Sequence, residues 1–481
     1  MGRQCSSPRG KARVASRAGQ APIDKNGLRW TYGAMRALVS TLALLLAAPA
    51  AADVRGTHLL GERMAGAGGA AVALADEPTG GVRNPAGLAS IGGIQGSVSV
   101  SAYQLLVQRQ AAALRVGDRS LDLDVVRFST FPAALGVAIP LVPRDGEGRH
   151  VLAINVLVPE QRSAGGQVET APGDATEAAP GAAMGFETRG RTFQFAAAWG
   201  WAITDSVRVG AMASYSLDEV HLSSRLVIEP PDGSFLVGAS QFSGLAGSLH
   251  LDVGFQIAVD PAWVLGASLR SESIRLHGSG EGSSVSATSS AGASKAMQRI
   301  DLMPGLRTER RDPWRIALGG AWLGPDGTRV AADLYVHVAQ AAYLDIQDPD
   351  LPAFDGLGRV NPSQPFGQSR QRVTTFDGAA GIEAPVTEDV TLRGGILTSL
   401  SPWPAPDPTD PRHPARIHAL GATFGVALPS EHGAMSLALS YLVGFGEGLA
   451  ARVAVDGGIS WERVDIVQHQ LTAVIGGAVR F

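Results

Sequence analysis

Apolar and polar residues alternate along most of this chain, in segments of roughly 9–14 residues separated by turn-forming residues, a length that suits a strand tilted across a bilayer. The segment 249–259 shows the pattern clearly. Its odd positions carry Leu249, Leu251, Val253, Phe255, Ile257 and Val259, and its even positions carry His250, Asp252, Gly254, Gln256 and Ala258. A period of two places these sets on opposite faces of a strand. One face therefore suits lipid and the other suits a polar interior.

The pattern predicts about fourteen strands, an even number of the kind that single-chain bacterial barrels favour. We place them at 94–107, 132–142, 150–158, 191–203, 206–219, 249–259, 262–277, 313–323, 328–340, 373–384, 389–401, 415–428, 434–443 and 467–481. Every backbone group must be hydrogen-bonded within lipid, so the sheet must close. The predicted fold class is all-β, a transmembrane antiparallel β-barrel over 94–481.

The connections between these strands alternate between short and long. Tight turns are expected near Thr204-Asp205, Asp260-Pro261, 324–327 and 429–433, where Gly, Pro and Asp gather. Long connections are expected at 159–190, 220–248, 278–312, 341–372, 402–414 and 444–466, and an extra hairpin at 111–126. A large soluble all-β protein would also alternate, but the regular order of short and long connections favours the barrel.

The N-terminus carries the features of an export signal. The apolar run Leu38–Ala48 follows Met35-Arg36 and leads to Ala50-Ala51-Ala52, so residues 35–52 read as a signal peptide. Residues 1–34 are a basic extension or an incorrectly assigned start. The single cysteine, Cys5, lies upstream of the expected cleavage site. With 17% charged residues and a formal net charge of −4, the composition gives no indication of nucleic-acid binding.

Residues 53–93 do not alternate. They are rich in small residues, including Gly66, Gly68 and Gly69, and they contain Asn84-Pro85-Ala86. This segment resembles the start of the FadL/TodX family of outer-membrane transporters, in which a short N-terminal hatch carries an Asn-Pro-Ala motif and folds into the barrel. The resemblance implies that residues 53–93 form a hatch, or plug, in the lumen. Small residues allow such a segment to pack its backbone closely against a wall.

The resemblance also implies a function and a location. We expect transport of hydrophobic molecules, long-chain fatty acids or aromatic or aliphatic hydrocarbons, across the outer membrane of a Gram-negative cell, with hatch-gated release and a lateral exit at a kinked strand. If that strand is 150–158, Pro159 lies at its outer end. Two alternatives stay open: a non-transporting barrel for protein secretion or surface anchoring, and a diffusion porin.

Candidate chemistry is sparse along the chain. We find no catalytic constellation and no metal or cofactor motif, so we expect neither an enzyme nor a bound cofactor. Arg270 and Arg315 are the inward-facing cations nearest the outer half and are candidate contacts for a ligand carboxylate. Asp252 and Arg270 should face each other in the lumen. The final residue, Phe481, resembles the assembly signal read by the barrel-assembly machinery. Lipopolysaccharide is an expected neighbour, and we expect a monomer.

Overall fold

The computed structural model describes residues 61, 63–116, 119–141, 149–170, 181–229, 233–289, 296–356, 359–361, 363–364, 366–410, 412–454 and 459–481. The predicted signal peptide at 35–52, the extension at 1–34 and the first residues of the predicted hatch lie outside these ranges. No helix among the described residues is both long and apolar enough to cross a membrane.

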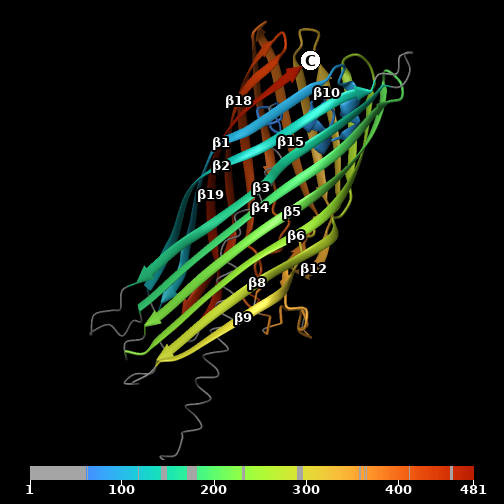
Figure 1. The fold of residues 1–481 in the computed structure, drawn as a ribbon. Coiled ribbons are helices and arrows are strands. Elements are labelled where there is room, and N and C mark those ends of the chain that lie inside the picture. The colour runs from blue at the N-terminus through green and yellow to red at the C-terminus, as the bar shows by residue number, and fades with distance from the viewer. Residues whose placement is uncertain are drawn as a thin grey trace, which may run out of the picture.

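The described chain is built almost entirely from β-strands (Figure 1). The strands that form the wall are β1 (Gln95–Val116), β2 (Arg119–Leu141), β3 (His150–Thr170), β4 (Gly181–Ala202), β5 (Val207–Glu229), β6 (Phe235–Ala258), β7 (Trp263–Arg270), β8 (Ile274–Ser289), β9 (Met297–Thr308), β10 (Arg315–Leu323), β11 (Arg329–His337), β15 (Thr375–Thr387), β16 (Val390–Ser399), β17 (Arg416–Ser430), β18 (Gly433–Val453) and β19 (Ile459–Arg480). The shorter strands β12 (Gln340–Leu344), β13 (Ile346–Gln347) and β14 (Ser369–Arg372) lie between β11 and β15.

Antiparallel ladders join neighbouring wall strands in sequence order and close the ring between β19 and β1. Two strands of the wall are each interrupted by a short irregular stretch: β7 continues as β8, and β9 continues as β10. As a result, β6 pairs first with β7 and then, further from the tight turns, with β8. The prediction of a closed all-β barrel is confirmed, and the expected number of strands agrees with the barrel to within one strand.

The tight turns lie where the sequence predicts them, at 203–206, 259–262, 324–328 and 431–432, and all four are at one end of the barrel. Most of the predicted long connections are wrong. Strands β3 to β6, β8, β9, β18 and β19 run on through much of 159–190, 220–248, 278–312 and 444–466, and 111–126 is the outer part of the β1–β2 hairpin. These parts are rich in Gly, Ser and charged residues. They form strands in the ladder, but they lack the alternating apolar face from which we predicted the strands in lipid.

The two ends of the barrel differ in which face of the wall carries most of the large apolar side chains. Near the tight turns such side chains point outward; Leu251, Val253, Phe255, Leu318 and Phe424 are 42–53% exposed. Near the far end, outward positions such as Arg225 and Gln241 are polar, while Met184, Phe186 and Leu226 point inward and are buried. The first region has the outer surface of a membrane-spanning wall, and the second that of a wall in water.

The inward apolar residues of the far end form a core that joins two parts of the wall. This core takes Leu114 and Leu123 from β1 and β2, Val453 from β18, and Phe186 and Leu226 from β4 and β5. Strands on opposite sides of the ring therefore pack against each other beyond the membrane. We call the part near the tight turns the membrane-level half and the part beyond it the outer half.

Candidate functional site

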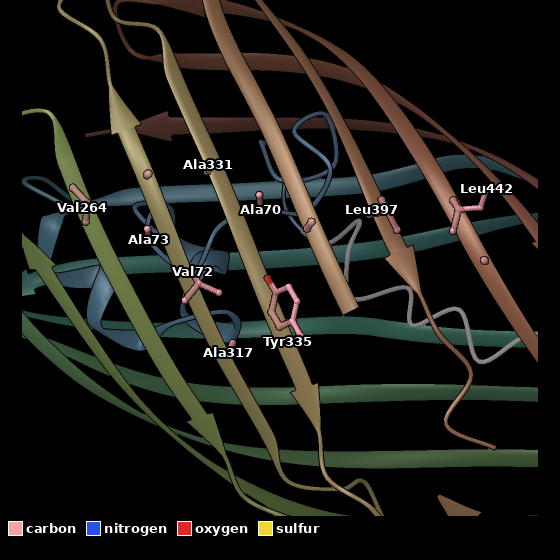
Figure 2. Packing of buried hydrophobic residues seen from close by; sticks show 12 residues of the cluster. Ala70, Val72, Ala73, Val264, Ala317, Ala331, Tyr335, Leu397 and Leu442 are labelled. Carbon is pink, nitrogen blue, oxygen red and sulfur yellow. The ribbon is translucent and has the colours of Figure 1, made fainter. Parts of the chain in front are cut away.

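A segment between residues 61 and 94 fills the lumen of the membrane-level half. It contains the 3-10 helices η2 (Pro78–Val82) and η3 (Pro85–Ser90), and nearly all of its described residues are buried. Figure 2 shows Ala70, Val72 and Ala73 of this segment packed against Val264, Ala317, Ala331 and Tyr335 of the wall. The segment occupies the place that the sequence predicts for the hatch, and we call it the hatch below.

The motif Asn84-Pro85-Ala86 lies against β5 and β6. The Asn84 side chain caps η3 by accepting a hydrogen bond from the Ala86 N–H (3.1 Å), and it donates to the carbonyls of Val72 (2.8 Å) and Phe255 (3.0 Å). It therefore fixes a turn within the hatch and links that turn to the wall. An asparagine is suited to this place because its amide both accepts and donates.

Glycines on the inner face of the wall make room for the hatch. A Cβ built on Gly254 would lie 2.1 Å from Asn84 Oδ1, and one on Gly210 would lie 2.3 Å from the carbonyl carbon of Pro85. Similar close approaches occur at Gly200, Gly266, Gly319, Gly381 and Gly395. These positions need glycine because atoms of the hatch, at most of them backbone, lie where a side chain would be.

Polar side chains of β11 and β17 bind the hatch backbone. The Asp333 carboxylate accepts from the N–H groups of Ala71 (2.6 Å) and Val72 (3.0 Å). The Thr423 hydroxyl accepts from the Gly68 N–H and donates to the Gly66 carbonyl, both at 2.9 Å. Buried backbone groups that no regular element pairs are satisfied in this way.

Arg270 and Arg315 lie between the hatch and the outer half. Asp252 is directly opposite Arg270 in the β6–β7 ladder and accepts from its Nε at 2.8 Å, so the predicted lumen pair is confirmed. Arg315 donates to the hatch carbonyl of Val82 (3.0 Å) and lies 3.6 Å from Asp252. With buried His250, these residues form a polar cluster on the inner face of β6, β7 and β10, which we call the collar. Neither arginine lines the pocket described next.

Beyond the collar, the outer half contains a pocket of about 1160 Å³, a volume that includes its open mouth. One side is apolar: Leu222, Phe242 and Ile346 line it, and Phe242 stacks in a tilted arrangement on Phe366, with ring centroids 5.6 Å apart. Side chains of this kind bind hydrocarbon because burying each methylene is worth about 0.8 kcal/mol.

The other side of the pocket is cationic. Arg310 donates to Asp218 (2.8 Å) and Thr192 (2.9 Å). Arg370 pairs with Asp345 at 2.8 Å. The guanidinium groups of Arg370 and Arg372 lie 5.3 and 5.0 Å from the ring centre of Trp403, within the range of a cation–π interaction.

The lining of the pocket carries five arginines against two aspartates and two glutamates, and Arg310, Arg370 and Arg372 gather on this side. This balance gives one end of the pocket an excess positive charge. Because guanidinium groups bind carboxylates in a planar, bidentate arrangement, that end suits a single anionic head group.

The loops that carry this cationic end are themselves closely packed. Arg412 donates to the Gln364 carbonyl at 3.0 Å and so links the loop 400–415 to the loop before β14. Burial lowers the pKa of Arg412 to about 10, and burial also raises the pKa of Tyr343. Both groups therefore keep their ordinary charge near neutral pH, Arg412 as a cation and Tyr343 as a neutral phenol.

The wall has a break beside the pocket. The β2–β3 ladder ends at the pair Ala134–Leu157, whereas β3 continues outward paired with β4, with a register shift between Leu157 and Glu160. Pro159 lies in that shift, and Pro132 lies on the β2 side; neither residue can donate a ladder hydrogen bond. Glu160 is paired with Thr192 of the pocket lining. The break lies in β3, next to Pro159, at the level of the pocket.

The sequence alone did not reveal the pocket. Phe242, Arg310, Arg372 and Trp403 all fall in segments that we expected to be outer connections. A lone tryptophan, Trp403, in a Pro-rich stretch was the available signal. No group of three or more His, Cys, Asp or Glu side chains among the described residues could hold a metal ion.

Comparisons with known proteins support the fold. No protein-family model matches the sequence, and no curated protein matches it. Among solved structures, a Pseudomonas aeruginosa FadL homologue is 13% identical, with a TM-score of 0.57 over 88% of this chain and 98% of its own. The Pseudomonas putida toluene transporter TodX is 14% identical, with a TM-score of 0.58 over 89% and 99%. The Ralstonia pickettii toluene transporter TbuX is 15% identical, with a TM-score of 0.51 over 89% and 99%. This chain has the fold of these transporters.

Proposed function

We propose that this barrel lies in the outer membrane of a Gram-negative cell and carries hydrophobic molecules, and that its ligands are long-chain fatty acids or similar amphiphiles with one negative charge. The observation that carries the proposal is the outer-half pocket, which is apolar around Phe242 and cationic around Arg310, Arg370 and Arg372. The structural neighbours support the substrate class more broadly, because two of them are named as toluene transporters.

The pocket and the break describe the first part of a route. A molecule reaches the pocket from the outer side, with its chain against Phe242 and its carboxylate toward Arg372. The β2–β3 break gives the pocket a lateral port, since β3 pairs there with β4 but no longer with β2. The collar lies between the pocket and the hatch on the β6, β7 and β10 side, so an anionic head group meets cations on its way toward the tight turns.

Arg270 and Arg315 form the second station in this proposal. A carboxylate that leaves the pocket meets these guanidinium groups in the collar. Arg315 holds the hatch through the carbonyl of Val82, so a carboxylate bound at Arg315 competes with the hatch for the same donor. The arrangement couples arrival of the anion to loosening of the hatch. The chemistry needs no covalent step and no cofactor.

Binding of matched lipids tests the proposal. Purified barrel should bind a fluorescent 16-carbon acid with saturation, and Arg372→Gln should weaken that acid by about tenfold or more, because hydrogen bonds to charged groups are worth roughly 1.5–3 kcal/mol. Binding of the matching alcohol should change little. Arg359→Gln is the control, since Arg359 pairs with Asp355 in an exposed loop away from the pocket.

The rival functions give different results in the same preparation. A hatch-filled lumen should show little steady conductance in planar bilayers. Large open-channel conductance without saturable lipid binding would identify a diffusion porin. Neither conductance nor binding would favour a role in secretion or surface anchoring.

A further inference from the structure

The hatch is held to the wall in different ways on its two sides. Its later part, with Val82, Leu88 and Ile91, packs in an apolar core with β2, β3, β4 and β5 and continues directly into β1. Its earlier part is held by charge. Arg63 pairs with Glu383 of β15 at 2.6 Å, and Asp76 pairs with Arg329 of β11 at 3.2 Å.

These contacts belong to one chain of charges near the tight-turn end. Arg63 also pairs with Asp76 within the hatch, and Glu383 pairs with Arg393 of β16 at 2.9 Å. Arg393 in turn donates to the Ser436 hydroxyl of β18 at 3.0 Å. Breaking the Arg63–Glu383 contact therefore leaves each partner with another ion pair, so neither charge is stranded.

A narrow gap, with room for about one water molecule, lies directly behind these ion pairs, between the hatch and strands β11 and β15. Its hatch side consists of Met64, Leu74 and three alanines, and its wall side includes Ala331 and Gly381, with Arg63, Arg329 and Glu383 at the rim. The small residues leave space at this side, and the ion pairs close its edge. We call this part of the hatch–wall boundary the seam.

We propose that the seam is the release gate toward the tight-turn end, and that the ion pairs Arg63–Glu383 and Asp76–Arg329 hold it closed. The earlier part of the hatch moves off β11 and β15, while the apolar packing around Leu88 and the covalent link to β1 act as the hinge. This inference rests on the proposed transport function and adds where the hatch gives way. The gate opens by exchanging ion-pair partners rather than by unfolding the hatch.

Neutralising one member of the seam tests this directly. Barrels in vesicles are loaded with the fluorescent 16-carbon acid, and its release is timed. Glu383→Gln should speed release about tenfold, the effect of removing roughly one charged hydrogen bond. Arg299→Gln, which removes the exposed Arg299–Asp301 pair of the outer half, is the matched control and should not change the rate. An unchanged rate in Glu383→Gln would overturn the proposal.

A covalent closure tests the position of the gate. Because the chain beyond residue 5 contains no cysteine, paired cysteines react without competition. Arg63→Cys with Glu383→Cys should release ligand quickly when free and stop when a short bifunctional thiol reagent joins the pair. The control pair is Gly81→Cys with Ala198→Cys, on the hinge side, where the two Cβ positions lie 3.5 Å apart. Joining that pair should leave release unchanged.

The outcomes separate this inference from the transport proposal. Equilibrium binding of the acid is measured first in every variant; absence of binding contradicts the proposed function itself. Normal binding with release blocked by the hinge-side link and not by the seam link would place the gate elsewhere and overturn the seam. Normal binding with neither link affecting release would show that the hatch is not the barrier.

Discussion

The membrane-level half and the outer half of this barrel are made from the same strands, but their large apolar side chains lie on opposite faces. On β6, Val253 points outward and is 53% exposed in the first half, whereas Phe242 points inward and is fully buried in the second. In lipid, an apolar outer face carries no free-energy penalty, so the inward positions can hold glycine and polar side chains that bind the hatch. In water, the apolar residues must turn inward. The reversal marks the membrane boundary and explains why the apolar pocket lies beyond it.

The glycines that make room for the hatch lie only in the membrane-level half, and replacing one of them should have the largest effect. Gly254→Leu places a branched side chain where Asn84 now lies, because even a Cβ would be 2.1 Å from Asn84 Oδ1. We expect the hatch to be displaced and steady conductance to appear in planar bilayers. Gly96→Ala is the control, since its added Cβ meets nothing within 4 Å. A silent Gly254→Leu channel would argue that the hatch does not occlude the lumen.

The core of the outer half predicts a large loss of stability. Phe186→Ala removes a buried ring from the cluster that joins β1, β2 and β18 to β4 and β5, and such truncations cost about 3–5 kcal/mol. Denaturant unfolding of the folded barrel in vesicles measures this loss. Phe195→Ala, nine residues further along β4 on the outward face of the membrane-level half, should cost much less, since Phe195 is 47% exposed. Equal losses would mean that the outer half has no core of its own.

Charge on the outer face gives a smaller, position-dependent effect. Val253→Arg puts a guanidinium in the lipid band and should cost about 2–4 kcal/mol. Gln241→Arg, on the same face of β6 but in the outer half, should stay within about 0.5 kcal/mol of the parent because surface substitutions in water are usually near neutral. Unfolding titrations of both variants compare them. A similar cost at the two positions would place the membrane boundary elsewhere on β6.

The same comparison explains what the sequence could reveal. The lipid constraint imposes alternation on segments such as 249–259, so strand positions, inward residues and the Asp252–Arg270 pair were predictable in the membrane-level half. The tight turns were predictable because Asp260-Pro261 and the residues 324–327 carry turn chemistry. The Asn84-Pro85-Ala86 segment was recognisable because its small residues do not alternate.

The outer half was not predictable for the same physical reason. With water on one side, the outer parts of β4 and β5 need no continuous apolar face, so positions such as Gly185 and Ser223 resemble loop residues in the sequence. The pocket also depends on contacts between distant segments: Phe242 of β6 meets Phe366 of a loop more than one hundred residues later. No local pattern reports such a meeting, so Arg270 and Arg315 were the only cations that the predicted register could suggest.

The most direct test of the account is photo-crosslinking with a 16-carbon acid that carries a diazirine near the end of its chain. The account predicts saturable labelling of peptides from the pocket wall, around Phe242, Ile346 and Phe366, and competition by unlabelled acid. Arg372→Gln should reduce this labelling more for the acid than for the matching alcohol. Labelling that does not saturate and falls on the outward residues of the membrane-level half, around Val253 and Phe424, would contradict the pocket as the binding site.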